Sequence, residues 1–148
     1  MRAHPNHLLA LAAALSTIAA LLHLECIYFG GPWYRVMGAG ERMARLAESG
    51  SSYPTVVTLF IACVLFIWAL YALSGAGAIR RLPLLRPILT AITAVYLIRG
   101  FALLPLMSVI PGRSLDFWLW SSATCAVFGI VHAVGLWQSW GRLAPARP

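Results

Sequence analysis

The chain is poor in charge and contains no lysine. Charged residues make up 10% of its 148 positions, against about 25% in a typical soluble domain. Only four of them are acids: Glu25, Glu41, Glu48 and Asp116. With 61% hydrophobic residues, this composition excludes an ordinary soluble domain. It predicts an integral membrane protein that crosses the bilayer several times.

Residues that bind metals or form disulfides are also few. The three cysteines, Cys26, Cys63 and Cys125, fall in separate apolar runs at spacings that match no zinc or redox motif. We interpret them as small buried hydrophobic residues. His23 and His132 are predicted at depths more than ~10 Å apart, which excludes one metal or haem held by both. We therefore expect no metal and no cofactor.

The net charge of +7 comes from eleven arginines. A strongly basic balance is typical of proteins that bind nucleic acid. Here, however, the arginines lie mostly at the ends of apolar runs, where they anchor and orient membrane helices. We therefore expect the lipid bilayer, and no nucleic acid, as the partner that explains the charge.

Four apolar runs are long enough to cross a membrane, since ~20 helical residues span the hydrocarbon core. They cover approximately residues 8–29, 53–73, 84–109 and 115–137. Backbone groups in lipid must satisfy their own hydrogen bonds, so each run is predicted to be helical. The fold class is therefore all-α: a single integral membrane domain over residues 1–148, built as a four-span transmembrane helix bundle.

The first loop, residues 30–53, carries its own structural signals. Glu41 and Arg45 are spaced i,i+4 within residues 41–48, with apolar residues on another face. This pattern predicts a short amphipathic helix on the outer membrane surface. Trp33, Tyr34 and Arg35 precede it and are interpreted as an interfacial anchor.

Arginine counts predict the orientation, because cytoplasmic loops are enriched in positive charge. Six arginines fall on the side of the termini and four on the other side; the six are Arg2, Arg80, Arg81, Arg86, Arg142 and Arg147. We therefore predict that both termini lie in the cytoplasm, and that the 30–53 loop lies outside.

Glu25 is the only acid in the interior of a predicted span, since Asp116 lies at the very start of the fourth span, and the predicted partner of Glu25 is Arg99. At ~1.5 Å of rise per residue, Glu25 lies ~25 Å along the first span and Arg99 ~21 Å along the third. An arginine does not lose its proton, so in a bundle it needs an anion or water. Asp116 is predicted slightly higher, within reach of the same guanidinium.

Three interpretations of this pair remain open. Glu25 and Arg99 lock the first and third helices together, or line a site for a polar ligand together with His23, Tyr96 and Asp116, or do not meet. His23 also has two interpretations: a packed histidine bonded to a neighbouring carbonyl or hydroxyl, or a titrating group beside the pair. It belongs to a stripe of small residues, Ala12, Ser16 and Ala19/Ala20, that suits close helix packing.

Short motifs give the chain a family resemblance. They are His23 with Tyr28-Phe29-Gly30-Gly31 at the end of the first span, and Arg99 followed by Gly100-Phe101 in the third. In these and in its layout the chain resembles small four-helix bacterial inner-membrane proteins of uncharacterised function. The resemblance implies a four-helix architecture in the inner membrane and no particular activity. Small multidrug resistance transporters also have four short spans, but the chain departs from them in the place of its glutamate and in carrying Arg99.

Three functional hypotheses follow. The leading one is a small-molecule binding or transport module with a polar pocket around Glu25 and Arg99, open to the outer side. The second is a non-catalytic accessory or structural subunit that docks a second copy of itself or a larger membrane partner. The third is an intramembrane enzyme that modifies a lipid or quinone, with His23 and Glu25 as acid and base.

Overall fold

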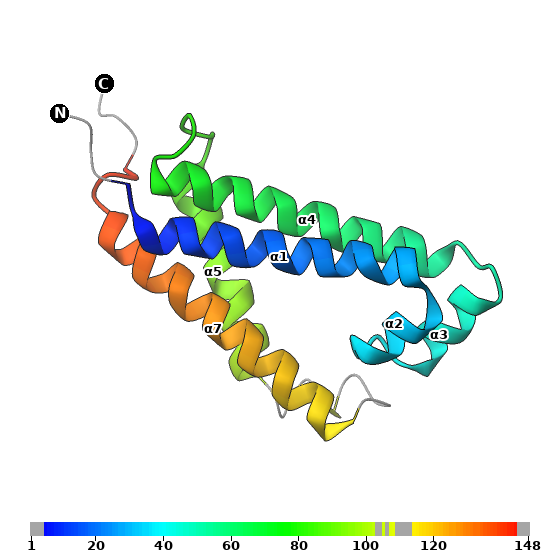
Figure 1. The fold of residues 1–148 in the computed structure, drawn as a ribbon. Coiled ribbons are helices and arrows are strands. Elements are labelled where there is room, and N and C mark those ends of the chain that lie inside the picture. Colours follow the sequence, from blue (N-terminus) through cyan, green and yellow to red (C-terminus); the bar gives the residue numbers. More distant parts are fainter. Residues whose placement is uncertain (1–4, 103–104, 106, 109–113, 145–148) are drawn as a thin grey trace.

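The fold is helical throughout the part of the chain that the structure describes. This structure is a computed structural model, and it describes residues 5–102, 105, 107–108 and 114–144. No strand occurs among these residues. Figure 1 shows the helices, which are α1 (His7–Phe29), α2 (Gly31–Val36), α3 (Glu41–Glu48), α4 (Tyr53–Ala76), α5 (Leu85–Phe101) and α7 (Leu115–Ser139).

Within the described part of the chain, three helices, α1, α4 and α7, are long and apolar enough to cross a membrane, where the sequence predicted four. The difference lies in the predicted 84–109 span, because α5 has 17 residues. That is a length of ~25 Å, against a hydrocarbon core of ~30 Å. The helix ends at Phe101, which directly follows Gly100, a residue of low helix propensity. Residues 103–104, 106 and 109 of the predicted span lie outside the described residues.

Asn6 ties three helices together where α1 begins. Its side-chain Oδ1 accepts from the backbone N–H of Leu9 at 2.9 Å and so caps α1. Its backbone N–H donates to Ala76 of α4 at 3.0 Å. Its side-chain amide donates to the Gly135 carbonyl at 3.1 Å and to Ser139 Oγ at 2.8 Å, both on α7. We call this end of the molecule the junction end.

Glycines bring α5 and α7 into close contact. A Cβ on Gly100 would lie 2.6 Å from the backbone N of Ala126, and one on Gly129 would lie 2.7 Å from Leu97 Cδ2. Only hydrogen atoms fit at these two positions, so the helices pack almost backbone to backbone. On α1 the predicted stripe of small residues is confirmed, since Ala12, Ser16 and Ala20 are buried.

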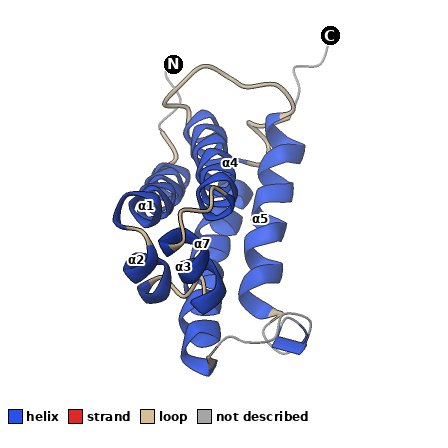
Figure 2. Cartoon of the chain, turned by 90° about the vertical axis from the view of Figure 1, so that its right-hand side faces the viewer, coloured by secondary structure: helices blue, strands red, loops and turns tan. Residues whose placement is uncertain are grey.

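The long helices form two packed pairs, α1 with α4 and α5 with α7. Figure 1 shows α1 and α7 close together at the junction end and separating toward the other end, where α2 and α3 lie beside the end of α1. Figure 2 shows α5 on the opposite side of the molecule from α2 and α3. The distance between the pairs therefore changes with depth along the bundle.

Helices α2 and α3, residues 31–48, form what we call the cap. The predicted helix over 41–48 is confirmed as α3, and α2 is an additional element. Tyr34, interpreted from sequence as part of an interfacial anchor, is instead 2% exposed, and it forms a 3.1 Å hydrogen bond with Thr58 Oγ1 of α4. It packs with Cys26 of α1 and Ala44 of α3 in a small core of its own. The cap is therefore seated on the α1–α4 pair.

Candidate functional site

Arg99 is the most unusual charged group in the bundle. It lies in the last turn of α5 and is half-buried. Its Nη2 donates to Ser121 Oγ at 2.7 Å and its Nη1 to Ser122 Oγ at 3.2 Å, both on α7. The guanidinium carbon lies 5.0 Å from the centroid of the buried Trp118 ring. All of these partners are neutral.

The predicted ion pair between Glu25 and Arg99 is absent. Glu25 lies one turn before the end of α1, half-buried. Every salt bridge among the described residues belongs to the cap. The two residues have similar predicted depths but lie on different helix pairs, because Glu25 belongs to the α1–α4 pair and Arg99 to the α5–α7 pair. These pairs separate toward the end of the molecule at which both residues lie (Figure 1).

Asp116 does not form an ion pair with Arg99 either. It lies in the first turn of α7 and is exposed. A carboxylate at that position favours the helix through its dipole. Ser114 caps the same helix by accepting from the backbone N–H of Phe117 at 3.1 Å.

The ring of His23 contacts a backbone carbonyl, as the interpretation of a packed histidine expects. Its Nδ1 lies 2.7 Å from the carbonyl oxygen of Ala19, one turn earlier on α1. A carbonyl only accepts, so Nδ1 carries the proton. The side chain is half-buried, and the structure places no hydrogen bond between His23 and Glu25.

Tyr96 faces a different neighbour from Arg99, although the two are three residues apart on α5. Its hydroxyl forms a 3.1 Å hydrogen bond with Ser16 of α1. Its ring lies 5.0 Å from Trp68 of α4 and 5.1 Å from His132 of α7, between centroids. Tyr96 thus belongs to the centre of the bundle, where all four long helices meet.

Sequence reasoning missed the contact between Tyr96 and His132. His132 is fully buried, and its Nδ1 lies 2.8 Å from the carbonyl oxygen of Phe128, which fixes the proton on Nδ1. Its Nε2 has no hydrogen-bond partner among the described residues. Depth estimates alone placed this histidine apart from the other polar groups. In the sequence, the available signal was that His132 follows Phe128 by four residues, which is one helical turn. This spacing places both side chains on the same face of α7.

The cap holds the remaining acids in an exposed network. Arg35 pairs with both Glu41 and Glu48, and Arg45 pairs with Glu41 at 2.9 Å, the i,i+4 pair predicted from sequence. Hydrogen bonds from Arg35 and Arg45 lower the pKa of Glu41 to about 2. The Arg35 hydrogen bond likewise lowers the pKa of Glu48. These two acids are therefore ionised and already paired at neutral pH.

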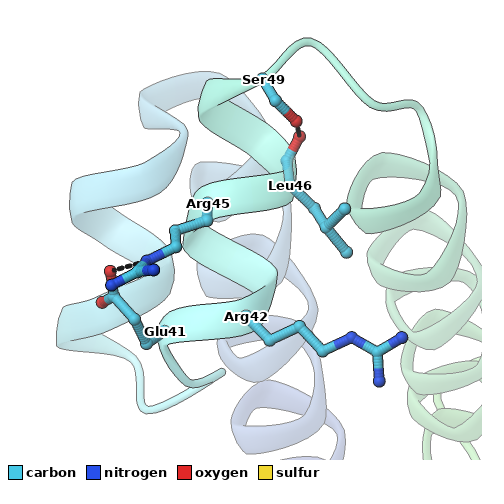
Figure 3. Close-up of a pocket in the computed structure, with 5 residues that line it drawn as sticks. All are labelled: Glu41, Arg42, Arg45, Leu46 and Ser49. Atoms are coloured by element: carbon cyan, nitrogen blue, oxygen red, sulfur yellow. Dashed lines mark hydrogen bonds and ion pairs between the residues drawn. The ribbon is translucent and has the colours of Figure 1, made fainter.

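Helix α3 also borders a surface hollow of about 600 Å³. Figure 3 shows its lining residues, with Arg42 extended away from the Glu41–Arg45 pair. The hollow is separate from Arg99 and Glu25. The cap does approach α7 elsewhere: a Cβ on Gly38, between α2 and α3, would overlap the Phe117 ring.

No group of three or more histidines, cysteines or acids within the described residues is arranged to hold a metal ion. The three cysteines are free thiols. Comparison of the chain with protein families, with curated proteins and with solved structures finds no match. The likeness to small four-helix inner-membrane proteins therefore stays a prediction.

Proposed function

We propose that the chain is a membrane-embedded binding module for a small molecule, which occupies the half of the bundle between Glu25 and Arg99. One observation carries the proposal: Arg99 is a permanent charge with only neutral partners. An ionisable group inside an apolar helix is costly and is usually retained for function. A packing lock would have paired it with Glu25.

Glu25 supports the same proposal from the opposite side of the site. Its carboxylate is half-buried on α1 and takes part in none of the ion pairs among the described residues. The two opposite charges do not neutralise each other, so each remains available to a ligand. Figure 1 shows the cap beside the end of α1, at the end of the bundle to which Glu25 belongs.

The proposal includes an orientation, with both termini in the cytoplasm and the cap outside a cell inner membrane. Arginines gather near the junction end, and Arg86 lies 3.6 Å above the Trp140 ring. Arg81 donates to the carbonyls of residues 142–144 just beyond α7. None of the four acids lies at that end of the described chain. Positive-inside topology depends on the count of arginines and not on the acids, and the excess of arginines at the junction end favours the cytoplasm for that end.

The test is thermal stabilisation of the purified full chain by three twelve-carbon amphiphiles in an uncharged maltoside detergent. The probes are dodecyl phosphate, dodecyltrimethylammonium and dodecanol. We expect at least one of them to raise the unfolding midpoint of the wild type in a saturable way, and Glu25→Gln or Arg99→Gln to remove the effect. Arg80→Gln is the matched control, because Arg80 is exposed at the junction end.

Saturable stabilisation that survives in both the Glu25→Gln and the Arg99→Gln variants would place the ligand elsewhere and end the proposal. A result in which none of the three probes stabilises the wild type in a saturable way would also end the proposal. A probe that stabilises wild type and Arg80→Gln equally, and loses its effect in one site variant, supports the proposal and shows which charge the ligand contacts.

A further inference from the structure

Arg99 donates hydrogen bonds to two serine hydroxyls, and no negative charge compensates its own charge. The chain has only four acids, and the structure describes all of them. Glu41 and Glu48 are bound to arginines of the cap, while Glu25 and Asp116 form no salt bridge. None of the four carboxylate side chains therefore forms an ion pair with Arg99.

The two serines extend the donor set. Ser121 and Ser122 accept hydrogen bonds from Arg99 through their oxygens, so each hydroxyl proton remains to be donated. Within the described residues neither hydroxyl donates to a backbone carbonyl, whereas nearby Thr124 donates to Trp120 at 2.8 Å. A guanidinium has five N–H groups, of which two are used here. Three N–H and two O–H donors therefore remain around one positive charge.

This set of donors matches an oxoanion. Phosphate, sulfate and carboxylate oxygens accept several short, charge-assisted hydrogen bonds, and the planar fork of arginine suits them in pairs. A cationic ligand would be repelled, and a neutral one would leave the charge uncompensated. The Trp118 ring lies against one face of the guanidinium, which directs a ligand to the edge that carries the N–H groups.

The position of the cluster fits the boundary between lipid headgroups and acyl chains. Arg99 is two residues from the end of α5, and Ser122 lies ~10 Å along α7 from Leu115. Ile98, Phe101 and Leu119 are exposed apolar residues near it in sequence on the same two helices. An anion with an apolar tail would find a charged site and an apolar wall together.

We propose that Arg99, Ser121 and Ser122 bind the phosphate-type oxoanion group of the ligand. This inference rests on the proposed function and names the chemical class of its ligand. The same chemistry has two sources, a phospholipid headgroup and a free oxoanion, and the experiment separates them.

The experiment measures the unfolding midpoint of the full chain in maltoside micelles with two probes. One is inorganic phosphate, compared with chloride at equal ionic strength; the other is short-chain phosphatidic acid, compared with the diacylglycerol of the same chain length. The variants are Arg99→Gln, the double variant Ser121→Ala/Ser122→Ala, and the control Arg80→Gln. The double variant keeps the arginine, so it remains informative if Arg99→Gln does not fold.

We expect phosphatidic acid to stabilise wild type and Arg80→Gln. In Arg99→Gln and in the serine double variant, its apparent Kd should be at least tenfold larger. Stabilisation by phosphate as well identifies a free oxoanion site, and stabilisation by phosphatidic acid alone identifies a lipid site. Equal stabilisation of all variants, or none by either probe, overturns the inference. If dodecyltrimethylammonium or dodecanol then still binds in a Glu25-dependent way, the proposed function stands without it.

Discussion

Replacing Asn6 by aspartate is expected to destabilise the fold by about 3 kcal/mol or more at neutral pH. The introduced carboxylate keeps the oxygen that caps α1 at Leu9. It loses the two donors that hold Gly135 and Ser139, and places a negative charge against the Gly135 carbonyl. Asn6 is 6% exposed. The loss of a buried hydrogen bond costs about 1–3 kcal/mol at each of the two contacts, although Ser139 Oγ keeps the hydrogen bond from Arg142 Nη2.

The measurement is the midpoint of unfolding by SDS in mixed micelles, with Ser114→Ala as the matched control. Ser114 caps α7 through one hydrogen bond to Phe117 and joins no second helix. Its loss should cost about 0.5–2 kcal/mol. If Asn6→Asp costs no more than this control, Asn6 is only a helix cap, and the junction of α1, α4 and α7 has been misassigned.

Gly100→Ala is expected to destabilise the chain by about 1–3 kcal/mol, although alanine is the better helix former. Helix propensity alone favours alanine over glycine by ~1 kcal/mol. The added methyl carbon, however, would lie 2.6 Å from the backbone N and 2.7 Å from the Cα of Ala126. Backbone atoms do not rotate away, so α5 and α7 must separate. That separation would also draw Arg99 away from Ser121 and Ser122.

Gly141→Ala is the control for this substitution, because nothing lies within 4 Å of a Cβ at that position. Its effect should stay within about 0.5 kcal/mol. Unfolding by SDS measures both variants, and binding of phosphatidic acid measures the effect on the site. A Gly100→Ala variant as stable as Gly141→Ala would show that α5 and α7 are not in close contact.

The sequence predicted best what depends on local pattern. The i,i+4 pair of Glu41 and Arg45 predicted α3 at its observed bounds, Glu41–Glu48. Apolar length predicted α1, α4 and α7, which are three of the four expected spans. The fourth prediction was too long, because apolar residues continue past Phe101 although α5 ends there. Apolar composition predicts which stretch of the chain can lie in a membrane. It does not predict where the helix ends, because helix ends depend on individual residues.

What the sequence could not predict is lateral position. Rise per residue gave similar depths for Glu25 and Arg99, yet depth does not say which helices are neighbours. The packing of Gly100 and Gly129 of α5 and α7 decides that Arg99 meets α7 and not α1. The contact of Tyr96 with His132 was missed for the same reason. Glycine positions on the two helices were the available signal.

A double-mutant cycle tests the central claim, that Glu25 and Arg99 leave each other free. The free energy of unfolding is measured without ligand for wild type, Glu25→Gln, Arg99→Gln and the double variant. The cycle of Ser16→Ala with Tyr96→Phe is the positive control, because those two residues share a buried hydrogen bond, for which about 0.5–1.5 kcal/mol is expected. For Glu25 and Arg99 we predict a coupling below about 0.5 kcal/mol, as for residues without shared partners. A coupling of about 1 kcal/mol or more would show that they form an ion pair, and would contradict this account.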